Sequence, residues 1–130
     1  MASLFTKISK VLAGWFRQEY FHSHIAMWLA VISVAANLTN WALIWIFIRP
    51  VDFPIILHYN VYFGVDMIGH WKQTYSLPAI GLFLILVNFF LAMHFYRSKN
   101  RIASYLIMMA ALMVQLCLIV ASASVIIINY

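Results

Sequence analysis

The sequence predicts an all-α integral membrane protein in which three helices cross the bilayer. Of its 130 residues, 66% are hydrophobic and only 8% are charged, and its mean hydropathy is +0.95. The apolar residues are gathered into three long runs separated by short polar or basic segments. Soluble domains are about half apolar and about a quarter charged. This composition therefore requires a bilayer as a second solvent and excludes a soluble enzyme, a disordered chain and a disulfide scaffold.

Residues 1–20 are expected to form an amphipathic helix that lies in the membrane interface. Apolar side chains recur at helical spacing, and basic or polar side chains occupy the opposite face. A basic face attracts an anionic cytoplasmic leaflet, and aromatic rings suit the headgroup boundary. The alternative is a helix that simply leads into the first span. The apolar face comprises Leu4, Phe5, Ile8, Val11, Leu12, Trp15 and Phe16, and the polar face comprises Lys7, Lys10, Arg17 and Gln18.

The first predicted transmembrane helix covers residues 24–48, which include no Asp, Glu, Lys or Arg. A helix of this length extends for about 37 Å and can span the bilayer with some tilt. A cleaved signal peptide is the alternative, because Ser33 and Ala35 fit a small-residue cleavage rule. The apolar run continues well beyond these two residues, which favours the transmembrane helix.

The second and third predicted transmembrane helices cover residues 78–96 and 102–128. Ser76 is the expected N-cap of the second, and Pro78 lies in its first turn, where the missing N–H costs nothing. Residues 97–101 join the two helices. Because this segment is short and basic, we expect a tight turn in water.

The basic residues predict how the chain is oriented. Arg97, Lys99 and Arg101 lie in the turn, and three more basic residues lie in the N-terminal segment, whereas the two in residues 49–77 are offset by Asp52 and Asp66. The positive-inside rule then places the N-terminus and the turn in the cytoplasm. Residues 49–77 and the C-terminus are expected outside the cytoplasmic (inner) membrane.

Each predicted span has a side-chain amide near its centre: Asn37, Asn88 and Gln115. We expect these three amides to lie at a similar depth and to bond one another across the helices, because an unpaired amide in hydrocarbon is costly. They could form a polar permeation or binding site, or they could hold the helices together. No ionisable residue lies deep within a span, which favours the second interpretation.

The third span has small residues at a seven-residue repeat: Ala103, Ala110, Cys117 and Ser124. Such a stripe lets another backbone approach closely. We expect it to pack against a helix of the same chain or of a second copy, so a homo-oligomer is one expectation. Cys117 is interpreted as a packing residue with a neutral thiol. As the only cysteine, it excludes an intrachain disulfide.

Residues 49–77 are expected to form a structured external loop. Gly64 and Gly69 bracket Asp66 and indicate a turn. Before them, apolar and polar side chains alternate with the period of an extended strand, whose apolar side should face the membrane surface or the helix ends. The alternating residues are Leu57, Tyr59, Val61 and Phe63 on one side and His58, Asn60 and Tyr62 on the other.

This loop resembles the signature of a known bacterial membrane family. The residues that carry the resemblance are Pro54-x-x-Leu57-His58-Tyr59-Asn60, then Gly64-x-Asp66-x-x-Gly69, then Lys72, and a helix that opens at Pro78 with Gly81. The family, of unknown function, is found in SdpI-like immunity proteins and has its pattern between the first two membrane helices. The spacing here departs from that pattern, since His70 and Trp71 intervene before Lys72.

The resemblance implies a bacterial membrane protein, some of whose relatives protect the cell from a secreted peptide toxin and signal its presence. It also implies that His58, Asn60, Asp66 and Lys72 are candidate ligand-binding or loop-shaping residues. From the residues alone, two other interpretations stay open. His58, Asp66 and His70 could bind a divalent metal, or His58 and Asn60 could bond Asp66 and the backbone to keep the loop folded.

Two functions are therefore expected. In the first, the external loop binds or senses an extracellular ligand, in immunity to a membrane-active peptide. In the second, the chain is an accessory or assembly subunit that packs into a larger membrane complex through its third helix. No enzyme motif or cofactor is expected, and nucleic acid is not an expected partner because the basic residues flank the spans.

Overall fold

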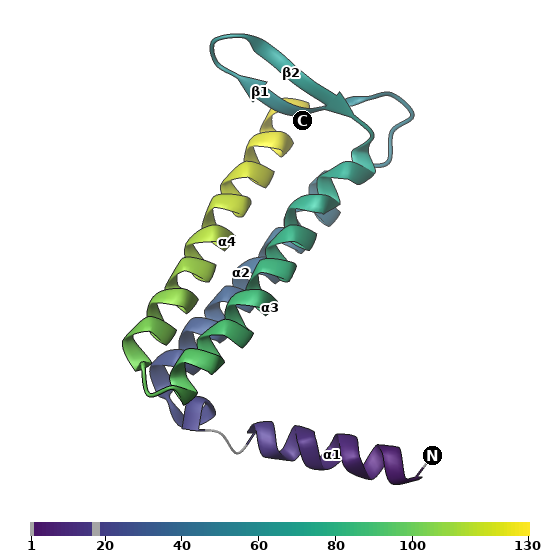
Figure 1. Cartoon of the computed structure of the whole chain (residues 1–130). Coiled ribbons are helices and arrows are strands. Elements are labelled where there is room, and N and C mark those ends of the chain that lie inside the picture. The colour runs from purple at the N-terminus through teal and green to yellow at the C-terminus, as the bar shows by residue number, and fades with distance from the viewer. Residues whose placement is uncertain (1, 17–18) are drawn as a thin grey trace.

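Three long helices form an elongated bundle, with a two-stranded hairpin across one end and a further helix across the other (Figure 1). The computed structural model describes residues 2–16 and 19–130; within α1 it describes side chains only for residues 4–10. The elements, in order, are α1 (Ala2–Phe16), the 3₁₀-helix η1 (Glu19–His22), α2 (His24–Phe47), β1 (Ile55–Asn60), β2 (Gly64–Gly69), the 3₁₀-helix η2 (Trp71–Tyr75), α3 (Ser76–Arg97) and α4 (Arg101–Asn129).

The chain has the helices of a multi-pass membrane protein. In the described residues, three helical segments are long and apolar enough to cross a membrane: α2, η2 together with α3, and α4. This confirms the three predicted spans, whose bounds differ by at most two residues from those of α2, α3 and α4. The basic turn is shorter than expected, because Arg97 and Arg101 are themselves helical.

The ends of the helices are closed by local hydrogen bonds. Ser23 caps α2, its Oγ accepting from Ala26 N at 3.4 Å, and Asn100 caps α4 in the same way. Ser76 is not the N-cap predicted for the second span. Because η2 runs directly into α3, Ser76 is already helical, and its hydroxyl donates to the Gln73 carbonyl at 2.7 Å.

The buried residues of α2 recur at alternating intervals of three and four, and those of α4 do so with one interval of seven. This is the spacing of helices that pack at a shallow angle. Most of these residues are small or polar, so the helix backbones approach closely, while large apolar side chains face outward, where lipid would surround them. The buried positions are Ala26, Ala30, Ser33, Asn37, Asn40 and Ile44 in α2, and Ser104, Met108, Ala111, Gln115, Ser122 and Val125 in α4.

A network of side-chain amides joins all three helices of the bundle. Asn37 Nδ2 donates to Gln115 Oε1 at 3.0 Å and to the Pro78 carbonyl at 2.9 Å. Gln115 Nε2 donates to the Gly81 carbonyl at 2.9 Å, and Asn37 Oδ1 accepts from Trp41 Nε1 at 3.1 Å. Every side-chain polar atom of Asn37 and Gln115 thus has a partner, which favours this pair in a low-dielectric interior.

Asn88 does not join this network, so the prediction that the three amides lie at one depth is wrong. Its Nδ2 donates to the Leu84 carbonyl of its own helix at 2.9 Å. On α3 the network lies at Gly81, seven residues before Asn88, which is about 10 Å along the helix axis. The network therefore lies closer to the start of α3 than Asn88 does.

The stripe of small residues on α4 does not form the buried face of this helix. Ala103 is half-buried, but Ala110, Cys117 and Ser124 are exposed. The buried face instead includes Gln115, because the amide network fixes how α4 is rotated. The prediction that this stripe packs against a helix of the same chain is therefore wrong for these three residues. That it packs against a second chain stays a prediction.

Aromatic side chains close the end of the bundle near the turn between α3 and α4. Tyr20 is fully buried. Its ring meets those of Phe89 and Tyr96 edge to face, with centroids 5.5 Å apart in both pairs. Burial raises the pKa of Tyr20 to about 12, because the apolar surroundings disfavour the phenolate. Nearby, the hydroxyls of Ser23 and Tyr105 lie 3.0 Å apart and tie α2 to α4.

The helix α1 lies across the bundle axis at this same end (Figure 1). Leu4 and Phe5 are exposed, as are Lys7 and Lys10. Its placement in a membrane interface stays a prediction. The predicted helical residues Arg17 and Gln18, and the side chains of Val11, Leu12, Trp15 and Phe16, lie outside the described residues.

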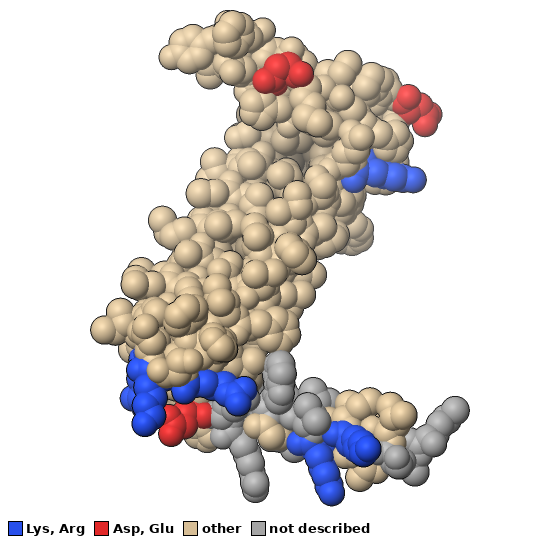
Figure 2. All heavy atoms as spheres, viewed as in Figure 1, with Lys and Arg blue, Asp and Glu red and all other residues tan. Residues whose placement is uncertain are grey.

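Charged side chains lie at the two ends of the bundle (Figure 2). Arg97, Lys99 and Arg101 gather at the end near α1, where Arg101 Nη2 lies 3.5 Å from Glu19 Oε2. We call this the basic end, and the opposite end, which carries the strands, the hairpin end. The separation of charge from the apolar middle is the pattern of a chain that spans a bilayer.

We predict that Gly81→Ala destabilises the bundle. A Cβ at this position would lie 2.7 Å from Gln115 Oε1 and 2.8 Å from Asn37 Nδ2. Relieving such overpacking costs about 1–3 kcal/mol, and the melting temperature of the detergent-solubilised protein should fall, as followed by circular dichroism. Gly14→Ala is the matched control, since no atom lies within 4 Å of a Cβ there. Equal melting temperatures for the two variants would contradict the prediction.

Candidate functional site at the hairpin end

The hairpin consists of two antiparallel strands, β1 and β2, joined by residues 61–63. Asn60 Oδ1 accepts from the Tyr62 backbone N–H at 2.9 Å, and Gly64 follows with a φ of +78°. A three-residue hairpin loop often ends in a residue with positive φ, which glycine adopts without strain. The predicted turn between Gly64 and Gly69 is therefore wrong: this segment is β2, and the predicted strand ends at Asn60.

The last residues of the chain hold the hairpin against the bundle. The Asn129 side chain bonds both backbone groups of Ile56: its Oδ1 accepts from the N–H at 2.9 Å, and its Nδ2 donates to the carbonyl at 2.7 Å. The Arg49 N–H donates to the Tyr130 hydroxyl at 3.1 Å. Sequence reasoning missed Asn129, and its only signal was an amide at the end of an apolar run.

Apolar packing supports the same attachment. Ile55, the first residue of β1, is buried together with Ile44 and Ile48 at the end of α2 and Val125 of α4. Burying a side chain of this size contributes about 1.5–3 kcal/mol. The base of the hairpin is thus part of the folded core.

His58 and Asp66 meet across the two strands. His58 Nδ1 lies 2.7 Å from Asp66 Oδ1, and the two side chains are 63% and 43% exposed. The strand register is irregular on both sides of His58, which pairs with Met67. This irregularity brings the side chains of His58 and Asp66 within hydrogen-bonding distance. Because both groups are exposed to solvent, the pair contributes little stability.

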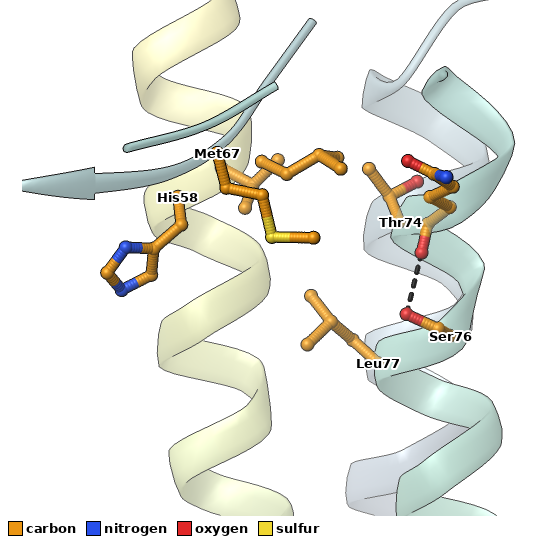
Figure 3. A pocket seen from close by; sticks show the side chains of 8 residues that line it. His58, Met67, Thr74, Ser76 and Leu77 are labelled. Carbon is orange, nitrogen blue, oxygen red and sulfur yellow. Dashed lines mark hydrogen bonds between the residues drawn. The ribbon is translucent and has the colours of Figure 1, made fainter. Parts of the chain in front are cut away.

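A cavity of about 500 Å³ lies between the hairpin and the ends of α3 and α4. Figure 3 shows Met67 and Leu77 facing each other across this space, while the His58 ring points away from it. Ser76 and Thr74 come from the opposite wall. The full lining comprises Leu57, His58, Met67, Gln73, Thr74, Ser76, Leu77 and Val125.

Gly69 leaves room for two of the residues that line the cavity. A Cβ at this position would collide with Gln73 Oε1 and with Leu57 Cδ1. Its φ is not positive, so the requirement is for space and not for an unusual backbone conformation. Gly69 therefore allows the end of β2 to pack closely on η2.

The other predicted site residues lie apart from the His58–Asp66 pair. His70 caps η2, its Nδ1 accepting from the Lys72 N–H at 3.2 Å, and Lys72 Nζ lies 5.6 Å from the centre of the Trp71 ring. Among residues 2–16 and 19–130, no group of three or more His, Cys, Asp or Glu could hold a metal ion. The metal alternative of His58, Asp66 and His70 is therefore wrong, because the fold does not gather these three side chains into such a group.

The cavity is suited to the apolar part of an amphipathic molecule. Leu57, Met67, Leu77 and Val125 offer hydrocarbon and thioether surface, and Gln73 and Ser76 offer hydrogen-bonding groups. Its volume lies in the range of about 300–1,000 Å³ that is usual for sites that bind small ligands.

Comparison of the chain with protein-family models, curated proteins and solved structures finds no match. Membership of the family found in SdpI-like immunity proteins therefore stays a prediction, which rests on the loop residues given above.

We predict that Asn129→Ala loosens the hairpin. The variant loses the side-chain amide that makes two hydrogen bonds to Ile56. At about 0.5–1.5 kcal/mol each, their loss corresponds to amide exchange in β1 that is roughly 5- to 150-fold faster. Hydrogen–deuterium exchange of peptides covering residues 55–60 measures this effect. Asn88→Ala is the control, because that amide bonds only within α3. Exchange in β1 that matches the control would show that Asn129 does not hold the hairpin.

Proposed function

We propose that this chain is a small bacterial membrane protein whose hairpin end binds an amphipathic ligand, in immunity to or sensing of a membrane-active peptide. The observation that carries the proposal is the apolar cavity roofed by the hairpin. A membrane-active peptide has bulky apolar side chains next to polar backbone. Such a side chain suits the cavity, and the backbone would meet the polar groups around it.

The charges support an external location for this site. The basic end carries Arg97, Lys99 and Arg101 in and beside the turn, whereas at the hairpin end Arg49 and Lys72 are offset by Asp52 and Asp66. By the positive-inside rule the basic end is cytoplasmic. The proposal therefore places the hairpin end and the C-terminus outside the inner membrane, where a secreted peptide arrives.

Each loop residue has a role in this proposal. Asn60 shapes the turn and His58 pairs with Asp66 across the two strands that roof the cavity. Asn129 and the buried Ile55 hold this roof against the bundle. Lys72 and Asp66 present charged groups to solvent near the cavity. They would bind polar or charged groups of the ligand. The resemblance to SdpI-like immunity proteins, which rests on these same residues, supports the biological setting.

Leu77→Trp should fill the cavity and weaken ligand binding at least tenfold. The probe is a dansyl-labelled cationic amphipathic peptide, titrated against the protein in nanodiscs and followed by fluorescence. Ile80→Trp is the matched control, since Ile80 lies on the same helix, is 52% exposed and does not line the cavity. Saturable binding that both variants retain equally would place the ligand elsewhere. If the unmodified protein shows no saturable binding, the proposal fails.

A second candidate function, an accessory or assembly subunit, is favoured by the small residues exposed on α4. Ala110 and Cys117 face outward, so a helix from another chain could approach α4 closely there. In this case the chain would pack into a homo-oligomer or a larger membrane complex. The two functions differ in which substitutions damage them.

Ala110→Leu and Cys117→Leu should break such an assembly, because a larger side chain holds the helices apart. The measurement is the mass of the detergent-extracted protein with its co-purifying partners. Met113→Leu is the control at an exposed position of the same helix. A stoichiometric complex that Ala110→Leu abolishes and His58→Ala leaves intact would support the subunit and count against immunity. A monomer in every variant would exclude the subunit.

A further inference from the structure

The turn of the hairpin exposes three consecutive apolar side chains. Val61 is 85% exposed, Tyr62 is 90% exposed and Phe63 is 86% exposed. Neither the rest of the hairpin nor the bundle covers them. A continuous apolar surface of this kind is unfavourable in water and marks a region that contacts another apolar phase.

The attachment of the hairpin fixes its height relative to the membrane. Gln115, in the amide network, lies near the middle of α4, and Asn129 follows fourteen residues later, about 21 Å along the axis. The hydrocarbon core reaches about 15 Å from its centre. With the middle of α4 at the middle of the bilayer, the strand bonded to Asn129 lies just beyond the hydrocarbon, at the level of the lipid headgroups.

The direction of the hairpin keeps its turn at this level. Figure 1 shows β1 and β2 running across the bundle axis, with their turn beyond the side of α4. The turn therefore lies over the lipid that surrounds the bundle, and it does not project along the axis into water. Tyrosine and other aromatic side chains are favoured at this depth, because part of the ring is apolar and part is polar.

The charges of the hairpin agree with this placement. Asp66 is the only Asp, Glu, Lys or Arg in residues 55–69, and it lies in β2, beside His58. The turn itself carries no charge that would have to be desolvated. We propose that residues 61–63 form a membrane anchor that inserts among the headgroups of the lipid leaflet at the hairpin end.

The proposed anchor would also determine where the cavity lies relative to the membrane. It fixes the roof of the cavity at the membrane surface, so the space between hairpin and helices lies beside the lipid. An amphipathic molecule already dissolved in the leaflet would reach it without crossing open water. The anchor itself does not depend on whether the cavity binds a peptide.

The test uses the full chain in phosphatidylcholine vesicles, without any ligand. In a Cys117→Ser background, Val61→Cys is labelled with the fluorophore NBD, and Asp52→Cys, an exposed site in the loop at the same end, is the matched control. Lipids with a nitroxide near the headgroup should quench the probe at residue 61 at least twofold more strongly than the probe at residue 52. Aqueous iodide should show the reverse order.

A second set of variants separates contact with lipid from contact with a second copy of the chain. Adding Tyr62→Asp and Phe63→Asp should abolish the nitroxide quenching at residue 61, while the circular dichroism spectrum stays that of the folded bundle. Strong iodide quenching at both labelled sites would overturn the proposal. Protection from iodide that disappears as the protein is diluted in lipid would also overturn it, and would assign the turn to an interface between two copies.

Discussion

The hydrogen bond between Asn37 and Gln115 sets the relative positions of the three helices. In hydrocarbon the large apolar side chains gain nothing by facing one another in place of lipid, so a bundle of this kind needs polar contacts and close backbone packing to define one arrangement. Here one amide pair also reaches two carbonyls of α3, at Pro78 and Gly81. The heights and rotations of α2, α3 and α4 follow from these contacts, and Gly81 leaves the space in which they form.

The hairpin depends on that arrangement. Its first strand is bonded to Asn129 at the end of α4 and packs on the ends of α2 and α4, so the position of the strands follows from how these helices are aligned. The cavity exists because the hairpin extends across the end of the bundle and leaves the space above Leu77 unfilled. A shift of α4 along its axis would move the roof of the cavity and the exposed turn together.

The two ends of the molecule differ in chemistry. One end has a dense basic turn and buried aromatic rings around Tyr20, and the other has a nearly neutral surface, an apolar cavity and an apolar turn. Helix α1 and the hairpin both lie across the bundle axis, one at each end (Figure 1). Both the cavity and the exposed apolar turn on which the proposals rest lie at the hairpin end.

The sequence by itself determined the three spans, the basic turn and the charge difference between the ends, because these depend on local composition and on runs of apolar residues. It also indicated that amides join the helices and that His58 and Asn60 shape the loop. Only the tertiary structure decided that Asn88 bonds its own helix, that the stripe of Ala110 and Cys117 faces outward, and that the segment from Gly64 to Gly69 is a strand. The strand forms by pairing with β1, and the other two features depend on how each helix is rotated and how high it lies relative to its neighbours. Contacts between residues far apart in the chain, such as Asn37 with Gln115 and Ile56 with Asn129, set both quantities, and no local pattern records them.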